Sequence, residues 1–489
     1  MGRKRRQDDG AAARPDRRAL LAGSAAVGLA AALPSARAQS VAPKATAQAG
    51  PSDGVPTVHL AAQPSMMAFR PGMETEILAF GRRAPGPELR ITRGEALKAR
   101  LVNNTGKPLS LHWHGVRIDN AFDGVSGLTQ EAVAPSGTQD LRFTPPDAGT
   151  FIYRPMTLGL AGEQTDHGLA GVVVVDDPSA PPVDLDTVIA VDDWRLSDDG
   201  RQEPFGEPRE RAFAGRLGNL VTVNGAPVPA TVSGPPGGRI RLRFASLCNA
   251  RLMRIRFQGP RAYVVAVDGQ PTDTFEPLRS TLPFAPGARY EIIVELPAQP
   301  GPAGGVDALI GDGVRLVNLV AEGPPARNRR AAFPPLSPLA ENRLLPAAIP
   351  LQKAHRADLL VEGGARPGPT GLEYHGDPQR IWTVNGVSGP VLGERFGKPL
   401  FSVKRGTPVV MTLINRTAFA QVLHLHGHCA RILHPYDDGW EPYWLDSVTA
   451  PEGQTVRFAF VADNKGRWLV GSGILERLDT GLSAWFEVT

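Results

Sequence analysis

Residues 93–103 read Arg-Gly-Glu-Ala-Leu-Lys-Ala-Arg-Leu-Val-Asn, a glycine turn that leads into an apolar strand with a polar residue at its end. The same order recurs at 238–246, where the strand ends in Phe-Ala-Ser, and at 405–415, where it ends in Leu-Ile-Asn. A second turn follows each copy some tens of residues later, and it reads Ala-Pro-Ser-Gly at 134–137, Ala-Pro-Gly at 285–287 and Ala-Pro-Glu-Gly at 450–453. An ordered pair that occurs three times predicts three homologous domains.

Composition favours an all-β chain. The 489 residues include 54 Gly and 47 Pro, and the apolar runs between them are short, as is typical of antiparallel sandwiches. No stretch has a long helical period with capping residues. We expect strands at Leu97–Val102, Val172–Asp176, Thr187–Asp192, Arg239–Ala245, Ile292–Leu296, Val409–Ile414 and Thr455–Phe460.

The domains are expected to follow one another along the chain. A prior of about 150 residues per domain agrees with the threefold repeat. We predict Greek-key β-sandwich domains at 56–180, 183–322 and 351–489. The Pro-rich segment Gly323–Pro350 is interpreted as an extended linker between the second and third domains.

The N-terminal 38 residues have the pattern of an export signal. The arginine pair Arg17-Arg18 precedes the apolar run Ala19–Leu33, and the small-residue motif Ala36-Arg37-Ala38 follows, as expected for cleavage. The arginine pair favours the twin-arginine route; the alternative is an ordinary secretory signal in which the pair occurs by chance. The apolar run is too short for a membrane anchor and no transmembrane segment is expected, so we expect a soluble periplasmic protein.

Charge argues against nucleic-acid binding. The whole chain has a formal net charge of +4, but residues 1–38 contribute eight Lys or Arg and only three Asp. Without them the net charge is about −1, too low for binding to a phosphate backbone by bulk charge.

The two cysteines, Cys248 and Cys429, are far apart in sequence and imply no disulfide framework.

Two pairs of histidines are the candidate metal ligands. His112 and His114 belong to Leu-His-Trp-His-Gly, and His424 and His426 belong to Leu-His-Leu-His-Gly-His. In a strand, residues i and i+2 point to the same face, so each pair presents two imidazoles in one direction. Imidazole binds copper and zinc well. Two such pairs, from the first and third domains, predict one shared metal site.

The chain resembles the multicopper oxidase family over nearly all of residues 39–489. Besides the two histidine motifs, the resemblance rests on Trp444-Leu445-Asp446, on Ala462-Asp463-Asn464 with Gly466-Arg467-Trp468, and on Ile474-Leu475-Glu476. It implies three cupredoxin-like sandwiches, a trinuclear copper cluster between the first and third, and one blue copper in the third.

The resemblance also implies which positions should hold copper. The blue-copper positions are occupied by Gln421, Ser472, Arg477 and Leu482, and none of these supplies the thiolate or the imidazoles that the metal needs. The mononuclear copper of the cluster maps to His112 and His424. The coupled copper pair maps to His114, His426, Arg154, Met156, Gly471 and Gly473. The family's oxidase chemistry therefore lacks most of its ligands in this sequence.

We first interpret the chain as a non-oxidase binding or scaffolding protein with a degenerate copper centre. It is similar in kind to the copper-free, cell-division-associated branch of the family in bacterial periplasms, and its protein partner is unidentified. The alternative is a copper-binding protein or metal-dependent oxidoreductase that uses His112, His114, His424 and His426. The cofactor is then one residual copper, with zinc as the other possibility; otherwise the four histidines are relics hydrogen-bonded within the interface, and there is no cofactor.

Arg154 should replace the lost metal as a link between domains. We predict that it bonds to a carboxylate or carbonyl of the third domain, and that Asp446 or Asp463 pairs with Arg154 or Arg477.

Overall fold

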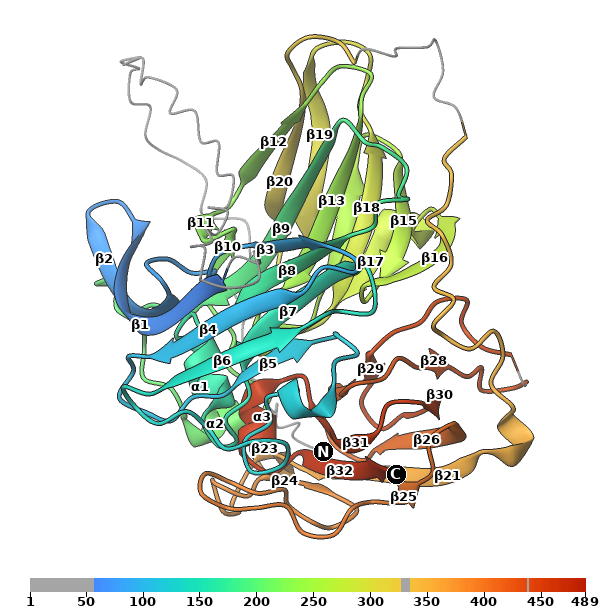
Figure 1. The fold of residues 1–489 in the computed structure, drawn as a ribbon. Helices are drawn as coiled ribbons and strands as arrows, with labels where there is room; N and C mark the ends of the chain where they lie inside the picture. Colours follow the sequence, from blue (N-terminus) through green and yellow to red (C-terminus); the bar gives the residue numbers. More distant parts are fainter. Residues whose placement is uncertain (1–56, 327–334, 438) are drawn as a thin grey trace, which may run out of the picture. The chain divides into compact units, whose positions relative to one another are not determined.

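The computed structural model describes residues 57–326, 335–437 and 439–489, all within one compact unit that spans Gln39–Thr489. The fold is nearly all β, and its larger sheets form three two-layer sandwiches (Figure 1). The predicted fold class is therefore confirmed. The predicted export signal at 1–38 lies outside the described residues.

The first sandwich pairs two four-stranded sheets. In sheet order, one consists of β2 (Met73–Phe80), β1 (Thr57–Arg70), β4 (Leu97–Asn103) and β6 (Thr138–Phe143), and the other of β3 (Leu89–Thr92), β8 (Gly171–Asp176), β7 (Gly149–Pro155) and β5 (Leu111–His114). Leucine, valine and aromatic side chains from both sheets form its core. The 3₁₀ turn η1 (Asn120–Phe122) and helix α1 (Ala161–Asp166) lie in its loops.

The second sandwich has a seven-stranded and a five-stranded sheet. The larger contains β11 (Ala226–Pro227), β10 (Leu220–Val223), β9 (Leu185–Trp194), β13 (Arg239–Ser246), β18 (Arg289–Glu295), β15 (Ala262–Val267) and β16 (Gln270–Phe275). The smaller contains β12 (Ala230–Gly234), β20 (Val314–Ala321), β19 (Gly301–Ala308), β14 (Met253–Gln258) and β17 (Thr281–Phe284). The turn η2 (Leu278–Ser280) belongs to this sandwich. Helix α2 (Pro208–Ala212) follows β9 in the sequence, but its Ala212 packs into the core of the third sandwich.

The third sandwich pairs two five-stranded sheets. One contains β24 (Trp382–Val384), β21 (His355–Gly363), β26 (Thr407–Asn415), β30 (Thr455–Ala462) and β28 (Arg431–Ile432), and the other β25 (Ser402–Val403), β32 (Ser483–Val488), β31 (Gly466–Ser472), β27 (Gln421–Leu425) and β29 (Ser447–Ala450). A hairpin of β22 (Arg366–Gly368) and β23 (Gly371–Glu373), the turn η3 (Leu351–Lys353) and helix α3 (Leu475–Asp479) also belong to this part of the chain.

All seven predicted strands are present, with ends that differ by at most three residues. The repeat has a physical basis, because the polar residue at each strand end is tied to the second turn of its own domain. The Asn103 N–H donates to the Gly137 carbonyl at 3.0 Å, the Ser246 N–H to Ala288 at 3.0 Å, and the Asn415 N–H to Gln454 at 3.0 Å. Each sandwich thus closes one end of its sheet in the same way.

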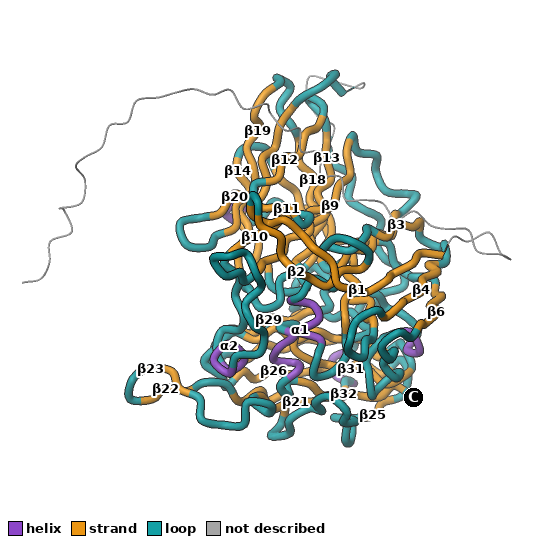
Figure 2. The backbone as a smooth tube through the Cα atoms, turned by 90° about the vertical axis from the view of Figure 1, so that its left-hand side faces the viewer, coloured by secondary structure: helices purple, strands orange, loops and turns teal. Residues whose placement is uncertain are grey.

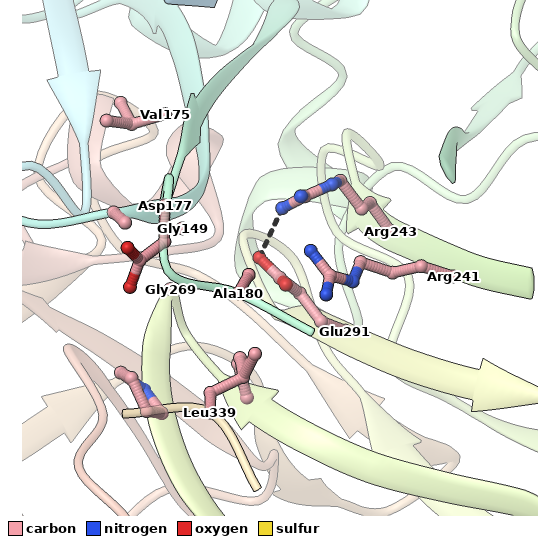
Figure 3. A pocket seen from close by; sticks show the side chains of 12 residues that line it. Gly149, Val175, Asp177, Ala180, Arg241, Arg243, Gly269, Glu291 and Leu339 are labelled. Carbon is pink, nitrogen blue, oxygen red and sulfur yellow. Dashed lines mark hydrogen bonds and ion pairs between the residues drawn. The ribbon is translucent and has the colours of Figure 1, made fainter. Parts of the chain in front are cut away.

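Ion pairs join the first and second sandwiches. The buried Arg243 of β13 pairs with Asp176 of the first sandwich at 3.3 Å and with Glu291 of its own sandwich at 2.6 Å, and it donates to the Thr150 hydroxyl of the first sandwich at 3.2 Å. Figure 3 shows the Arg243–Glu291 pair with Arg241 beside it at a cavity of about 20 Å³. That volume holds about one water molecule, so this interface is a structural contact rather than a ligand site.

Helices α1, α2 and α3 meet at a junction of the three sandwiches: α3 contacts both α1 and α2, which are purple and labelled in Figure 2. The Asp479 carboxylate of α3 accepts hydrogen bonds from the N–H groups of Ala161 (3.1 Å) and Gly162 (2.7 Å), which begin α1. The Glu476 carboxylate accepts the Arg216 N–H at 2.5 Å. Within the described ranges, no helix has the length and apolar character of a membrane span.

Burial makes this junction sensitive to pH. It raises the pKa values of Asp166, Glu476 and Asp479 to about 7 each. A carboxyl whose pKa is higher in the folded state holds its proton more tightly there, so its contribution to stability is complete below the unfolded pKa of about 4–4.5 and is lost as pH rises through about 7.

We expect Glu476→Gln to raise the melting temperature more at pH 8.5 than at pH 5.5. Glutamine resembles the protonated acid and keeps an oxygen for the Arg216 N–H, so the gain at high pH reflects up to about 3 kcal/mol of avoided charge burial. Thermal melts at both pH values measure the difference. The exposed Glu452→Gln is the matched control; an equal shift for both variants, or a shift independent of pH, would contradict the prediction.

Candidate metal centre

Strand alternation directs the two histidine pairs toward each other. Leu111 and Trp113 of β5 point into the core of the first sandwich, so the intervening His112 and the following His114 face the other way. On β27, Leu423 and Leu425 pack into the core of the third sandwich, which turns His424 and His426 outward. The sequence prediction that these pairs converge is met in the structure, where all four side chains are at least 97% buried.

The four imidazoles form two stacks. The rings of His114 and His424 lie 3.7 Å apart and those of His112 and His426 lie 4.0 Å apart, with interplanar angles of 22° and 27°. His112 Nε2 lies 3.3 Å from His424 Nε2. One ligand atom from each of His112, His114 and His424 can be chosen so that all three lie within 4.8 Å of one another.

Two aspartates orient the rings. The Asp123 carbonyl accepts a hydrogen bond from His112 Nδ1 at 2.7 Å, and its carboxylate oxygens each lie 3.1 Å from His426 Nδ1. The Asp446 carbonyl lies 3.1 Å from His424 Nδ1. A carbonyl can only accept, so His112 and His424 carry their protons on Nδ1 in the neutral form and leave Nε2 as a lone pair.

Arg154 has a different partner from the one predicted. Its Nη2 lies 3.0 Å from Nδ1 of His114 in the same sandwich, and its Nε has no hydrogen-bond partner among the described residues. The prediction of a bond to a third-domain carboxylate or carbonyl is wrong. The cause is register: Arg154 of β7 is paired with His112 on the adjacent strand β5, which keeps the guanidinium beside its own sheet. Burial, together with repulsion from Arg289, lowers the pKa of Arg154 to about 9.

A buried charge pair does join the second and third domains, and Arg289 supplies its cation. This fully buried residue of the second sandwich forms two hydrogen bonds with the Asp446 carboxylate of the third, one of them at 3.1 Å from Nη1 to Oδ1. We name this Arg289–Asp446 pair the charge clasp. Gly115 makes room for it, because a Cβ at this position (φ 89°) would lie 2.8 Å from an Asp446 oxygen and collide with the guanidinium.

The pKa values of Asp446 and of the neighbouring Asp268 both depart from the usual value of an aspartate. Burial raises the pKa of Asp268 to about 7, and the neighbouring Asp446 adds to the rise. Burial acts on Asp446 in the same direction, but the positive charge of Arg289 outweighs it and holds the pKa below its usual value. Asp446 is thus the anion of the pair. Asp463, the other candidate partner, lies 3.3 Å from Arg117 instead.

Arg477 pairs with neither predicted aspartate. Its Nη1 donates to the Gln421 side-chain oxygen at 2.8 Å and to the Ala420 carbonyl at 2.8 Å, and its Nη2 donates to the Phe213 carbonyl at 3.0 Å. The guanidinium carbon lies 4.8 Å from the Trp382 ring centroid, within the range of a cation–π contact. Burial lowers the pKa of Arg477 to about 10, so it is charged at neutral pH.

Sequence reasoning missed Asp123, Arg289 and Asp268. Asp123 lies nine residues after His114 and precedes a glycine, a turn pattern that was available as a signal. A second cluster, Asp192, Asp193 and Cys248, lies in the second sandwich. Asp193 is already 2.8 Å from Arg251 and burial raises the pKa of the Cys248 thiol, so this cluster offers protonated sulfur rather than thiolate.

Family models of multicopper oxidases match residues 61–180, 186–302 and 367–489, which is most of the chain. The chain belongs to the multicopper oxidase family. It is 29% identical over 456 residues to the multicopper oxidase MmcO of Mycobacterium tuberculosis, covering 85% of this chain and 83% of that protein.

Solved structures of multicopper oxidases have the same fold. The enzyme from Pseudomonas thermotolerans superposes with a TM-score of 0.78 at 28% identity, covering 88% of this chain and 99% of the other. The enzyme from Pseudomonas parafulva gives 0.74 at 27% identity, covering 88% and 100%. The His112–His424 contact therefore lies in a multicopper oxidase fold, between the sandwiches that contribute the two motifs.

Proposed function

We propose that this protein is a multicopper oxidase-family member that does not reduce oxygen and that binds one metal ion between its first and third sandwiches. The claim that the protein does not reduce oxygen rests on the Arg477–Gln421 hydrogen bond. These two residues occupy positions that the family resemblance assigns to blue copper, and both are buried. Blue copper needs a thiolate and two imidazoles, whereas this site contains a fixed cation, an amide and the Ser472 hydroxyl. These residues do not fit the metal.

The positions assigned to the coupled copper pair are also filled. A Cβ at Gly471 would lie 2.6 Å from Leu478 Cδ1, so an imidazole there would displace that leucine. Met156 packs with Leu478 and other apolar side chains in one buried cluster. Protein interiors leave few voids of side-chain size, and these contacts support the loss of the pair rather than an empty cage.

The claim that one metal ion binds rests on the 3.3 Å separation of His112 Nε2 and His424 Nε2. When the rings are neutral, each of these nitrogens carries a lone pair and no proton. Two lone pairs this close repel each other unless a cation or a proton lies between them. Ligands about 2.0–2.1 Å from a tetrahedral metal are about 3.3 Å apart. The pair thus fits two ligands of one zinc or copper ion, which would hold the first and third sandwiches together.

His114 is the third candidate ligand, and Arg154 restrains it. A guanidinium has no acceptor, so the 3.0 Å contact requires His114 Nδ1 to accept and places the neutral ring's proton on Nε2. Gly287 of the second sandwich lies against that Nε2, since a Cβ there would approach it to 2.7 Å. His114 can ligate through Nε2 only after its proton moves, whereas His426 is held by Asp123.

Added Zn²⁺ or Cu²⁺ is expected to raise the melting temperature, because a ligand of the native state stabilises it by mass action, by about 2.7 kcal/mol at 100 times Kd. His112→Ala with His424→Ala should abolish the shift, and calorimetric titration should show one ion per chain in the wild type only. The exposed pair His59→Ala with His375→Ala is the matched control. A shift that survives loss of His112 and His424 would place the metal elsewhere.

The metal-free scaffold is the competing function, and the positive charge of Arg154 favours it by repelling a cation. The same titration separates the two. If neither ion binds and the protein emerges metal-free from metal-supplemented growth, the four histidines are packing residues of a scaffold, and the metal half of the proposal fails.

The site of action is proposed to be the periplasm, on the strength of the signal pattern at 1–38. Mass spectrometry of the exported protein is expected to give a chain that starts at Gln39. A mature chain that retains Arg17-Arg18 would contradict export through this signal.

A further inference from the structure

A cavity of about 420 Å³ lies between the second and third sandwiches, apart from the histidines. The second sandwich contributes Phe275, Leu278 and Tyr290, and the third contributes Val422, Tyr443 and Leu445, among others. Cavities of 300–1,000 Å³ at domain interfaces, lined by aromatic and aliphatic side chains with few polar groups, are typical of small-molecule sites.

The walls suit a flat ring. Phe275 and Tyr443, one from each sandwich, face each other with nearly parallel rings, 6.5 Å between centroids and 27° between planes. Leu278 is 82% exposed although it belongs to the lining.

The two charged residues that line the cavity, Asp268 and Arg254, differ in whether a ligand could pair with them. Asp268 is buried and already accepts hydrogen bonds from the N–H groups of Arg289 (3.1 Å) and Asp446 (3.3 Å). Arg254 is exposed on β14 and donates to the Thr281 hydroxyl at 2.8 Å, and no carboxylate among the described residues lies within ion-pair distance of it. The cavity therefore offers one cation that is free to meet an anion.

We propose that this cavity binds a planar aromatic anion, with its rings along Phe275 and Tyr443 and its acidic group at Arg254. The inference does not depend on the metal site. The two sites are nevertheless adjacent, because Ser447 lines the cavity and its hydroxyl lies 3.3 Å from His424 Nδ1.

Fluorescence titration with 1-anilinonaphthalene-8-sulfonate, an aromatic anion with a planar naphthalene ring, tests the proposal on the folded full-length mature protein. We expect one saturable site, and at least a fivefold rise in Kd for Arg254→Gln. Arg256→Gln is the matched control, because Arg256 is exposed on the same face of β14 but does not line the cavity; its Kd should change less than twofold. The uncharged analogue N-phenyl-1-naphthylamine should be insensitive to Arg254→Gln.

Filling the cavity provides an independent arm. Thr449 is an exposed lining residue, so Thr449→Trp should abolish binding without affecting the fold, whereas Thr455→Trp, exposed on β30 outside the lining, should not. Melting temperatures confirm that each variant is folded. Equal binding by the Thr449 and Thr455 variants, or equal loss for the Arg254 and Arg256 variants, would overturn the proposal, because the dye would then be held by general surface charge or apolar patches.

Discussion

Arg289→Ala is expected to lower the free energy of unfolding by about 3–5 kcal/mol, because it leaves Asp446 buried without its cation. Asp446 is 1% exposed, its carboxylate lies 3.2 Å from His424 Nδ1, and its backbone N–H donates to Asp268. With the guanidinium gone, the anion either stays unpaired at low dielectric or takes up a proton, and both weaken the contact between the second and third sandwiches. Chemical denaturation at pH 7 measures the loss.

Two variants make the result specific to the charge clasp. Arg100 forms an ion pair with Asp140 at 2.6 Å, but both side chains are about half exposed or more, so Arg100→Ala should cost far less stability than Arg289→Ala. Arg289→Lys keeps the charge but loses the two-pronged geometry, and we expect an intermediate loss. If Arg289→Ala cost no more than Arg100→Ala, the clasp would contribute nothing to the interface.

The position of the histidine cluster was predictable from sequence because it depends on local periodicity. Once residues 111–114 and 421–425 are strands, alternation forces His112 and His424 off the cores that Leu111 and Leu423 enter. The repeat predicted three homologous domains, and the structure explains it, since the Asn103 and Asn415 N–H groups make equivalent bonds to the second turn in their domains.

The partners of the buried charges were not predictable in this way. Arg289 meets Asp446 only because two sandwiches dock with Gly115 between them, and no spacing along the chain encodes that docking. Arg154 illustrates the same limit. The sequence identified a buried cation at a former ligand position, but its partner depended on strand register, which placed His114 within 3.0 Å before any residue of the third sandwich.

Wild-type protein loaded with copper is expected to show no intense visible band, and the triple variant Gln421→His, Ser472→Cys, Arg477→His is expected to acquire one. The intense band of blue copper requires a thiolate ligand with two imidazoles. Gln421 and Arg477 are in direct contact, and Ser472 lies on β31, next to β27. Replacement of the three restores the family's ligand types and removes the buried cation.

The partial variants and the activity assay separate the two lost centres. Ser472→Cys alone should stay colourless, because the Arg477 guanidinium still occupies the site and repels copper. The triple variant should still fail to couple phenol oxidation to oxygen reduction, since Arg154, Met156, Gly471 and Gly473 supply no ligand to a coupled copper pair. Blue wild-type protein would mean that copper finds a thiolate outside these positions. A folded but colourless triple variant would mean that residues 421, 472 and 477 do not surround one site, and the argument from Arg477 against oxidase activity would fall with it.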